Sequence, residues 1–242
     1  MEKRGKEMQR KLEYRNVKSY SLRGIEGIIL KGILTGFVFT AVLMLTGCNI
    51  ESSIEKQLAD TMTVMNSAEK DYRLAQDELT ELEKTEQQLF NETMKLTQQQ
   101  QEELTLKVTE LEALLGQRLD RLQKEEAAID KAKATATDFD AIIKEADEQE
   151  KGTIQRLKVA VDERYAYHAE FIAAYKKLAA LQEELYKMLS TDGTQLWELT
   201  EQVDKVNSQN VTVQAVVTTF NESTEKVNIV KEDVFTILQT DK

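Results

Sequence analysis

The chain has 242 residues, 41% hydrophobic and 31% charged, with no proline, one cysteine, one histidine and one tryptophan. A single cysteine cannot form an intrachain disulfide, and one histidine beside one cysteine cannot supply a zinc site rich in these ligands. No nucleophile elbow, phosphate-binding loop or His-Glu-x-x-His motif occurs in the sequence. We therefore expect a protein that is not an enzyme and has no cofactor and no metal site.

The N-terminal segment differs in charge from the rest of the chain. Residues 1–31 carry nine basic and four acidic side chains, a net charge of +5, whereas the remaining residues carry 23 basic and 39 acidic side chains, a net charge of −16. Residues 33–46 contain no charged side chain. A basic segment followed by a short apolar stretch is typical of an export signal, and a membrane-spanning helix needs about 20 apolar residues. We predict a signal peptide over residues 1–47.

The end of this apolar stretch, Leu45-Thr46-Gly47-Cys48, resembles the lipobox of bacterial lipoprotein precursors. The resemblance implies that the Cys48 thiol receives a diacylglyceryl group and that the signal peptidase cleaves after Gly47. It also implies fatty acylation, for example with palmitate, of the new amino group. Two or more acyl chains give stable anchoring, whereas one chain holds a protein only marginally. We therefore expect the mature chain to be attached to the cell membrane through Cys48.

The segment before Cys48 is long for such a signal. A start at Leu30 would place one positive charge directly before the apolar stretch. We hypothesise that Leu30 is the true initiator and that residues 1–29 are not translated, which N-terminal sequencing of the trapped precursor would test.

Residues 48–242 predict an all-α, long antiparallel up-and-down bundle of four helices. The sequence Ser52-Ser53-Ile54-Glu55 fits a capping box with Ser52 as N-cap. Apolar residues then recur in steps of three and four, as in coiled coils, over residues 54–93, 104–143, 154–189 and 196–238. Breaks are predicted at residues 91–101, at 147–153 around Gly152, and at 190–194 around Gly193. A helical hairpin that completes its core as a homodimer is the alternative.

Polar residues interrupt the four apolar stripes at several positions, which the periodicity treats as mismatches: Thr61, Glu86, Thr93, Arg118, Glu125, Arg164, His168, Gln182, Asn210, Thr224 and Lys231. We interpret His168 as a histidine at the edge of the core, bonded to a neighbouring helix, because a metal site would need further ligands. Gly116, inside the second stripe, indicates a close approach of two helices.

Two aromatic features could bind a ligand. Helical spacing favours core positions for the tyrosines at 165, 167 and 175, although aromatic faces also stack on sugar rings. Trp197 falls in the first turn of the fourth helix, where we expect it to pack over the preceding loop as an anchor. Exposure of Trp197 would instead favour a binding role.

The lipobox and three further segments together resemble the YkyA family of cell-wall-binding lipoproteins from low-GC Gram-positive bacteria. These segments are Glu81-Leu-Glu-Lys-Thr-Glu-Gln-Gln-Leu-Phe90, Val161-Asp-Glu-Arg-Tyr165 and Glu184-Leu-Tyr-Lys-Met-Leu189. The resemblance implies an all-helical protein anchored by lipid to the outer, extracytoplasmic face of the cytoplasmic membrane. Cys48 is the one functional position that it transfers, and it transfers no catalytic residue.

Two functions fit these observations, a cell-wall-binding module and a membrane-anchored scaffold for protein interactions. The charge of −16 repels phosphate, which argues against nucleic acid and against simple electrostatic attachment to teichoic acids. Binding to the wall would need divalent cations or neutral contacts to glycan and peptide. The expected partners are therefore the membrane, through the lipid, and either peptidoglycan or an envelope protein. Family resemblance favours the wall, and the sequence leaves the ligand and the oligomeric state open.

Overall fold

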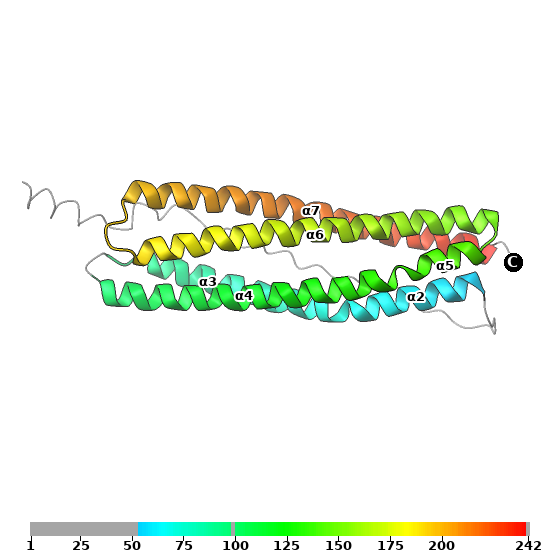
Figure 1. Cartoon of the computed structure of the whole chain (residues 1–242), viewed down its shortest axis with the longest axis horizontal. Coiled ribbons are helices and arrows are strands. Elements are labelled where there is room, and N and C mark those ends of the chain that lie inside the picture. The colour runs from blue at the N-terminus through cyan, green and yellow to red at the C-terminus, as the bar shows by residue number, and fades with distance from the viewer. Residues whose placement is uncertain (1–52, 98–99, 241–242) are drawn as a thin grey trace, which may run out of the picture. The chain divides into compact units, whose positions relative to one another are not determined.

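The computed structural model describes residues 53–97 and 100–240, and every regular element in these ranges is a helix (Figure 1). The helices are α2 (Ile54–Ala68), α3 (Lys70–Thr93), α4 (Gln101–Thr135), α5 (Asp138–Glu145), α6 (Glu148–Ser190) and α7 (Leu196–Thr240). The predicted first helix corresponds to α2 with α3, and the predicted second helix to α4 with α5. The all-α fold with four helical segments is confirmed. Within the described ranges, no helix combines the length and apolar character needed to cross a membrane.

The first helix begins at a serine cap, one residue later than predicted. Ser53 is the N-cap of α2, and its Oγ accepts a hydrogen bond from the backbone N–H of Lys56 at 3.1 Å. The predicted cap, Ser52, lies outside the described residues. Two adjacent serines offer the same capping oxygen, so the sequence pattern could not distinguish the two positions.

The break predicted at residues 147–153 is present but lies earlier in the chain than Gly152, because α5 ends at Glu145 and α6 begins at Glu148. Asp147 caps this helix: its Oδ1 accepts the backbone N–H groups of Gln149 and Glu150, each at 2.9 Å. In return, Glu150 Oε2 accepts the N–H of Asp147 at 3.1 Å. This reciprocal capping box satisfies donors that a helix start otherwise leaves unpaired, so the helix begins before the glycine.

The other two glycines also differ from each other. Gly193 has a φ of +87°, in the left-handed region that favours glycine, and it lies in the predicted turn between α6 and α7. Gly116 lies in the exposed part of α4, and a Cβ added there would meet no atom within 4 Å. The predicted close helix approach at Gly116 is therefore wrong.

The described residues divide into two compact units. Unit 1 contains residues 80–119 and 176–211, and unit 2 contains residues 53–79, 120–175 and 212–240. Each of α3, α4, α6 and α7 therefore contributes residues to both units, whereas α2 and α5 belong to unit 2.

Unit 2 has one apolar core built from all four helical segments, so this chain completes it without a second copy. Two hydrogen bonds between the first and second helical segments show in which direction these segments run relative to each other. Gln57 Nε2 donates to Glu145 Oε2 at 3.0 Å, and Gln76 Nε2 donates to Glu125 Oε2 at 2.5 Å. The order reverses between the two segments, which is the predicted antiparallel arrangement. The core includes Leu58, Met62, Ile129, Phe139, Leu157, Tyr165, Phe220, Val227 and Val234.

Unit 1 likewise buries apolar residues from α3, α4, α6 and α7. Gln202 of α7 donates to the backbone oxygen of Leu181 in α6 at 2.9 Å, which joins the two helices that flank the Gly193 turn. The buried residues follow the predicted stripes and include Phe90, Leu104, Val108, Leu111, Leu115, Leu178, Leu185, Tyr186, Leu199, Val203 and Val206.

Candidate functional site

The predicted lipid attachment residue, Cys48, lies outside the described residues, as do Leu45, Thr46 and Gly47. Lipid attachment therefore stays a prediction. Among the residues that the structure does describe, no group of three or more His, Cys, Asp or Glu side chains gathers as a metal site. The candidate sites among the described residues are three buried clusters of polar side chains and one exposed aromatic residue.

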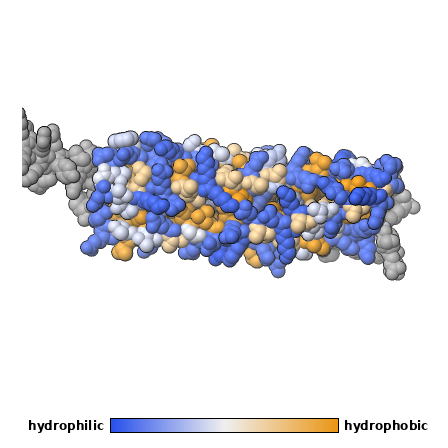
Figure 2. All heavy atoms as spheres, in the orientation of Figure 1, coloured by the Kyte–Doolittle hydropathy of each residue, from blue (hydrophilic) through white to orange (hydrophobic). Residues whose placement is uncertain are grey.

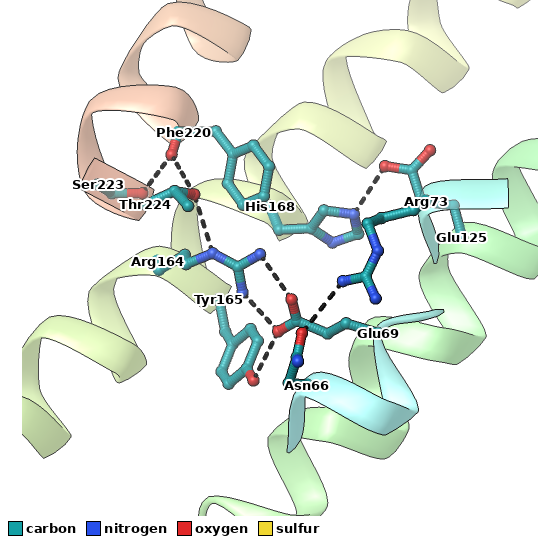
Figure 3. A network of polar contacts seen from close by, with 10 residues as sticks. All are labelled: Asn66, Glu69, Arg73, Glu125, Arg164, Tyr165, His168, Phe220, Ser223 and Thr224. Carbon is teal, nitrogen blue, oxygen red and sulfur yellow. Dashed lines mark hydrogen bonds and ion pairs between the residues drawn. The ribbon is translucent and has the colours of Figure 1, made fainter. Parts of the chain in front are cut away.

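The first cluster, in unit 2, is an ion pair between α6 and the residue that separates α2 from α3 (Figure 3). Arg164 Nη1 donates to Glu69 Oε1 at 2.7 Å, and Arg164 Nη2 donates to Glu69 Oε2 at 3.0 Å. The Tyr165 hydroxyl donates to Glu69 Oε1 at 3.1 Å. All three side chains are buried. The two parallel bonds from one guanidinium make this a strong, orientation-specific pair.

The same guanidinium also contacts α7. Arg164 Nε donates to the Thr224 hydroxyl at 2.9 Å, and this hydroxyl donates to the Phe220 carbonyl at 3.1 Å. The guanidinium carbon lies 5.1 Å from the centre of the Phe220 ring, within the range of a cation–π contact. Burial opposes the charged form of Arg164, but attraction and hydrogen bonds from Glu69 outweigh it and raise the pKa. Arg164 therefore keeps its positive charge inside the core.

The second cluster, also in unit 2, contains the histidine. His168 Nε2 lies 2.9 Å from Glu125 Oε1 on α4, and Gln76 of α3 donates to the other carboxylate oxygen. Burial raises the pKa of Glu125, and the hydrogen bonds from His168 and Gln76 counteract part of this rise. The His168 ring is buried and lies 5.5 Å from the Phe220 ring. These contacts confirm the interpretation of His168 as a core residue bonded to a neighbouring helix.

The third cluster lies in unit 1. Arg118 of α4 donates through Nη1 to Glu86 Oε2 of α3 at 2.7 Å and to Gln182 Oε1 of α6 at 3.1 Å. Its Nη2 also lies 3.6 Å from Glu83 Oε1. The Tyr186 hydroxyl donates to Glu86 Oε1. One buried guanidinium thus connects three helices and two carboxylates.

These clusters are made largely of the residues that the stripe analysis treated as mismatches. All eleven mismatch positions are buried, so the core contains them and the stripes continue through them. The sequence signal was present as polar residues at core positions. The bond of His168 to a neighbouring helix was predicted, whereas the role of the other polar residues in the clusters was missed, because their partners lie on other helices. Both oxygens of Glu69, Glu86 and Glu125 bond to protein groups, so these carboxylates hold helices together.

The aromatic residues separate into core and surface. Tyr165 and Tyr175 are buried, as helical spacing predicted, whereas Tyr167 is half-buried and packs against the core from its edge. Trp197 is 64% exposed. A Cβ added at Gly193, four residues earlier, would meet no atom within 4 Å, so the space above the turn is open. The prediction that Trp197 packs over this loop is wrong, and its exposure favours a binding role.

The described helices pack around an apolar core, so the chain is an all-α bundle protein. Its described polar clusters join the helices to one another. Within that class, the chain belongs to the YkyA family: the family model, described as "Putative cell-wall binding lipoprotein", matches residues 53–237. The predicted family is confirmed. Membership places the chain among lipoproteins, which are membrane-associated.

One curated relative and one solved structure illustrate this similarity. The chain is 29% identical over 211 residues to the uncharacterized lipoprotein YkyA of Bacillus subtilis (strain 168), across 84% of this chain and 92% of that relative. It also resembles the crystal structure of a conserved protein of unknown function from Staphylococcus aureus. That similarity has a TM-score of 0.66 at 20% identity and covers 75% of this chain and 91% of the other, and it supports the fold alone.

Proposed function

We propose that the chain is a lipid-anchored, non-catalytic module that binds the cell wall from the outer face of the cytoplasmic membrane. The family match across residues 53–237, with its cell-wall-binding description, carries this proposal. The described clusters support a binding role over a catalytic one, because their carboxylates and guanidinium groups are used inside the core. The proposed anchor is the diacylglyceryl group on Cys48.

The charge of the chain limits how it can bind the wall. Unit 1 carries 14 acidic and 8 basic side chains, and the described part of unit 2 carries 23 acidic and 14 basic side chains. Both units are therefore net negative and repel polymers rich in phosphate. The proposed contacts are made to the uncharged glycan and peptide parts of peptidoglycan.

The wall-binding proposal is tested by co-sedimentation of the full chain, purified in mild detergent, with insoluble peptidoglycan. The preparations should include peptidoglycan with and without teichoic acid, each with and without Ca²⁺. We expect the chain to pellet with peptidoglycan that lacks teichoic acid, without added Ca²⁺. Failure to pellet under every condition would contradict the proposal.

The anchor is tested separately by replacing Cys48 with serine, which removes the thiol that would form the thioether. We expect loss of labelling by a palmitate analogue and accumulation of uncleaved precursor, or its release into the medium. Ser53→Ala is the matched control, since it changes a nearby side chain and keeps the thiol, and its label should remain. Undiminished label in the Cys48→Ser chain would contradict lipid attachment at Cys48.

Exposed apolar side chains support a second candidate function, a scaffold for envelope proteins. Leu106 on α4 and Val211 on α7 are each 66% exposed in unit 1, and the face seen in Figure 2 shows hydrophobic residues scattered among hydrophilic ones. Long helices that present such residues can pair with partner helices. Reproducible crosslinking to one envelope protein in intact cells, without pelleting on peptidoglycan, would favour the scaffold.

A further inference from the structure

Trp197 differs from every other aromatic residue that the structure describes. It is 64% exposed, whereas nine of the other ten described aromatic residues are buried and Tyr167 is half-buried. Tryptophan is among the residues most enriched in binding hot spots, because its large flat ring gives much contact area at a small cost in conformational entropy. Its exposure makes Trp197 a candidate for a binding contact.

The backbone under Trp197 is held firmly. The N–H of Gln195 donates to Glu198 Oε2 at 2.8 Å, and the side-chain amide of Gln195 donates to the Gly193 carbonyl at 2.8 Å. Leu199 is buried in unit 1 and fixes the first turn of α7. Trp197 precedes Leu199 by two residues, which corresponds to a rotation of about 200° around the helix axis. Trp197 therefore faces away from the core. The ring is presented to solvent by an ordered turn.

The surroundings of Trp197 exclude an apolar helix as its partner. A helix-binding surface would repeat apolar residues at spacings of three, four and seven. Those positions after Trp197 are Thr200, Glu201 and Asp204, all exposed. Within residues 190–204, Trp197 is the one large apolar side chain that is exposed.

Charge near Trp197 restricts the partner further. Residues 190–204 contain four carboxylates and no basic side chain. This segment therefore repels phosphate polymers and anionic membrane surfaces. The polar residues that precede Trp197 in the α6–α7 turn include side chains with hydroxyl and amide groups, among them Thr191, Thr194 and Gln195. The combination of one flat aromatic face with neutral hydrogen-bonding groups suits a sugar, whose ring has an apolar C–H face and polar edges.

We propose that Trp197 stacks against uncharged sugar rings of the peptidoglycan glycan, with the hydroxyl and amide groups of the α6–α7 turn at the edges of the sugar. This inference rests on the wall-binding function proposed above and names the part of the chain that contacts the wall. It assigns the contact to unit 1.

Three variants of the full chain test this assignment by co-sedimentation with peptidoglycan freed of teichoic acid. Trp197→Leu keeps an apolar side chain and removes the aromatic face, and we expect its affinity to fall about tenfold or more, as for a hot-spot residue. Trp197→Tyr keeps an aromatic face and should retain most of the affinity. Leu74→Ala removes an exposed apolar side chain of unit 2 and should bind as the parent chain does.

Fluorescence gives a second readout at the same position, because Trp197 is the chain's one tryptophan. We expect its emission to change saturably when soluble glycan fragments from digested peptidoglycan are added. Circular dichroism of each variant should match the parent chain, since an exposed side chain contributes little to folding.

The outcomes separate this inference from the wall-binding proposal. Equal pelleting of the parent and Trp197→Leu chains, without an emission change on adding glycan, would overturn the role of Trp197 and leave wall binding standing. Failure of the parent chain to pellet would overturn both. An emission change that follows protein concentration without glycan would show that a second copy of the chain covers Trp197, which also overturns the inference.

Discussion

The two units stabilise their cores with the same three kinds of side chain, taken from different helices. In each unit a buried glutamate binds one arginine and one tyrosine. In unit 2, both partners of Glu69 are neighbours on α6, Arg164 and Tyr165. In unit 1, the arginine that binds Glu86 comes from α4 and the tyrosine from α6. The same chemistry can therefore join different pairs of helices.

The units also differ in how the glutamate binds its partners. Glu69 of unit 2 accepts hydrogen bonds from both terminal nitrogens of Arg164 and from the Tyr165 hydroxyl. Glu86 of unit 1 accepts hydrogen bonds from Arg118 and Tyr186, and the Glu83 carboxylate lies 3.6 Å from the same guanidinium. Arg118 therefore keeps a carboxylate nearby when Glu86 is removed. We expect unit 2 to be the more sensitive of the two to loss of its glutamate.

The largest expected effect follows from Glu69→Ala. Removing one partner of a buried pair leaves an uncompensated charge and costs about 3–5 kcal/mol. Glu86→Ala should cost less, because Glu83 remains near Arg118. Hydrogen exchange of the amides in each unit measures the two losses separately.

Glu163→Ala is the matched control for Glu69→Ala. Glu163 pairs with Lys226, and their side chains are 42% and 54% exposed. A pair with this much solvent contact contributes less than about 1 kcal/mol. Equal losses for Glu69→Ala and Glu86→Ala would show that the second carboxylate of unit 1 gives no protection.

The next largest loss of stability is expected when either buried tyrosine loses its hydroxyl group. Tyr165→Phe and Tyr186→Phe each remove a hydrogen bond to a buried carboxylate and keep the ring. Hydrogen bonds to charged groups contribute about 1.5–3 kcal/mol, so each change should lower the free energy of unfolding of its unit by a similar amount. Denaturant unfolding with hydrogen exchange measures both. A lower free energy of unfolding in only one unit would show that the two tyrosine hydroxyls do not play the same role.

A smaller change should stabilise unit 1 without touching its cluster. Gly116 lies in α4 with open space where a Cβ would be, so Gly116→Ala should raise the free energy of unfolding by about 1 kcal/mol. Thermal unfolding followed by circular dichroism measures the gain. Destabilisation by alanine would mean that a contact at Gly116 has been overlooked.

The smallest change at neutral pH is expected for Glu125→Gln in unit 2. Burial raises the pKa of Glu125 above its ordinary value of 4.5, so the folded chain holds the proton more tightly than the unfolded chain. The stability that this carboxyl contributes is complete below pH 4.5 and is lost as the pH rises through the raised pKa. A neutral amide has no such dependence and can still bond to His168 and Gln76.

The measurement for Glu125→Gln is the free energy of unfolding as a function of pH. At pH 7 we expect a change below about 1 kcal/mol, because the amide is close in shape and removes a buried charge. The difference between the two chains should grow in favour of glutamine as the pH rises above 4.5. A large loss at pH 7, like that of Glu69→Ala, would show that Glu125 needs its charge to hold the helices.

The sequence by itself predicted the four helical segments, the turn at Gly193 and the family, because each depends on local information. Apolar periodicity determines which face of a helix is buried, and a left-handed turn requires a residue without a Cβ. The lipobox around Cys48 is likewise a local motif. Local signals were weaker at helix ends, where Ser53 and Asp147 proved to be the caps.

The tertiary structure alone decided which polar core residues meet, and that Trp197 remains exposed. The stripe positions of Arg118 and Arg164 were visible in the sequence, but their partners lie on other helices. Periodicity specifies a direction around one helix axis and contains no information on the rotation or register of the helix opposite. Pairing across a core and exposure at its edge are set by those two quantities, so they emerged only when the helices were packed together.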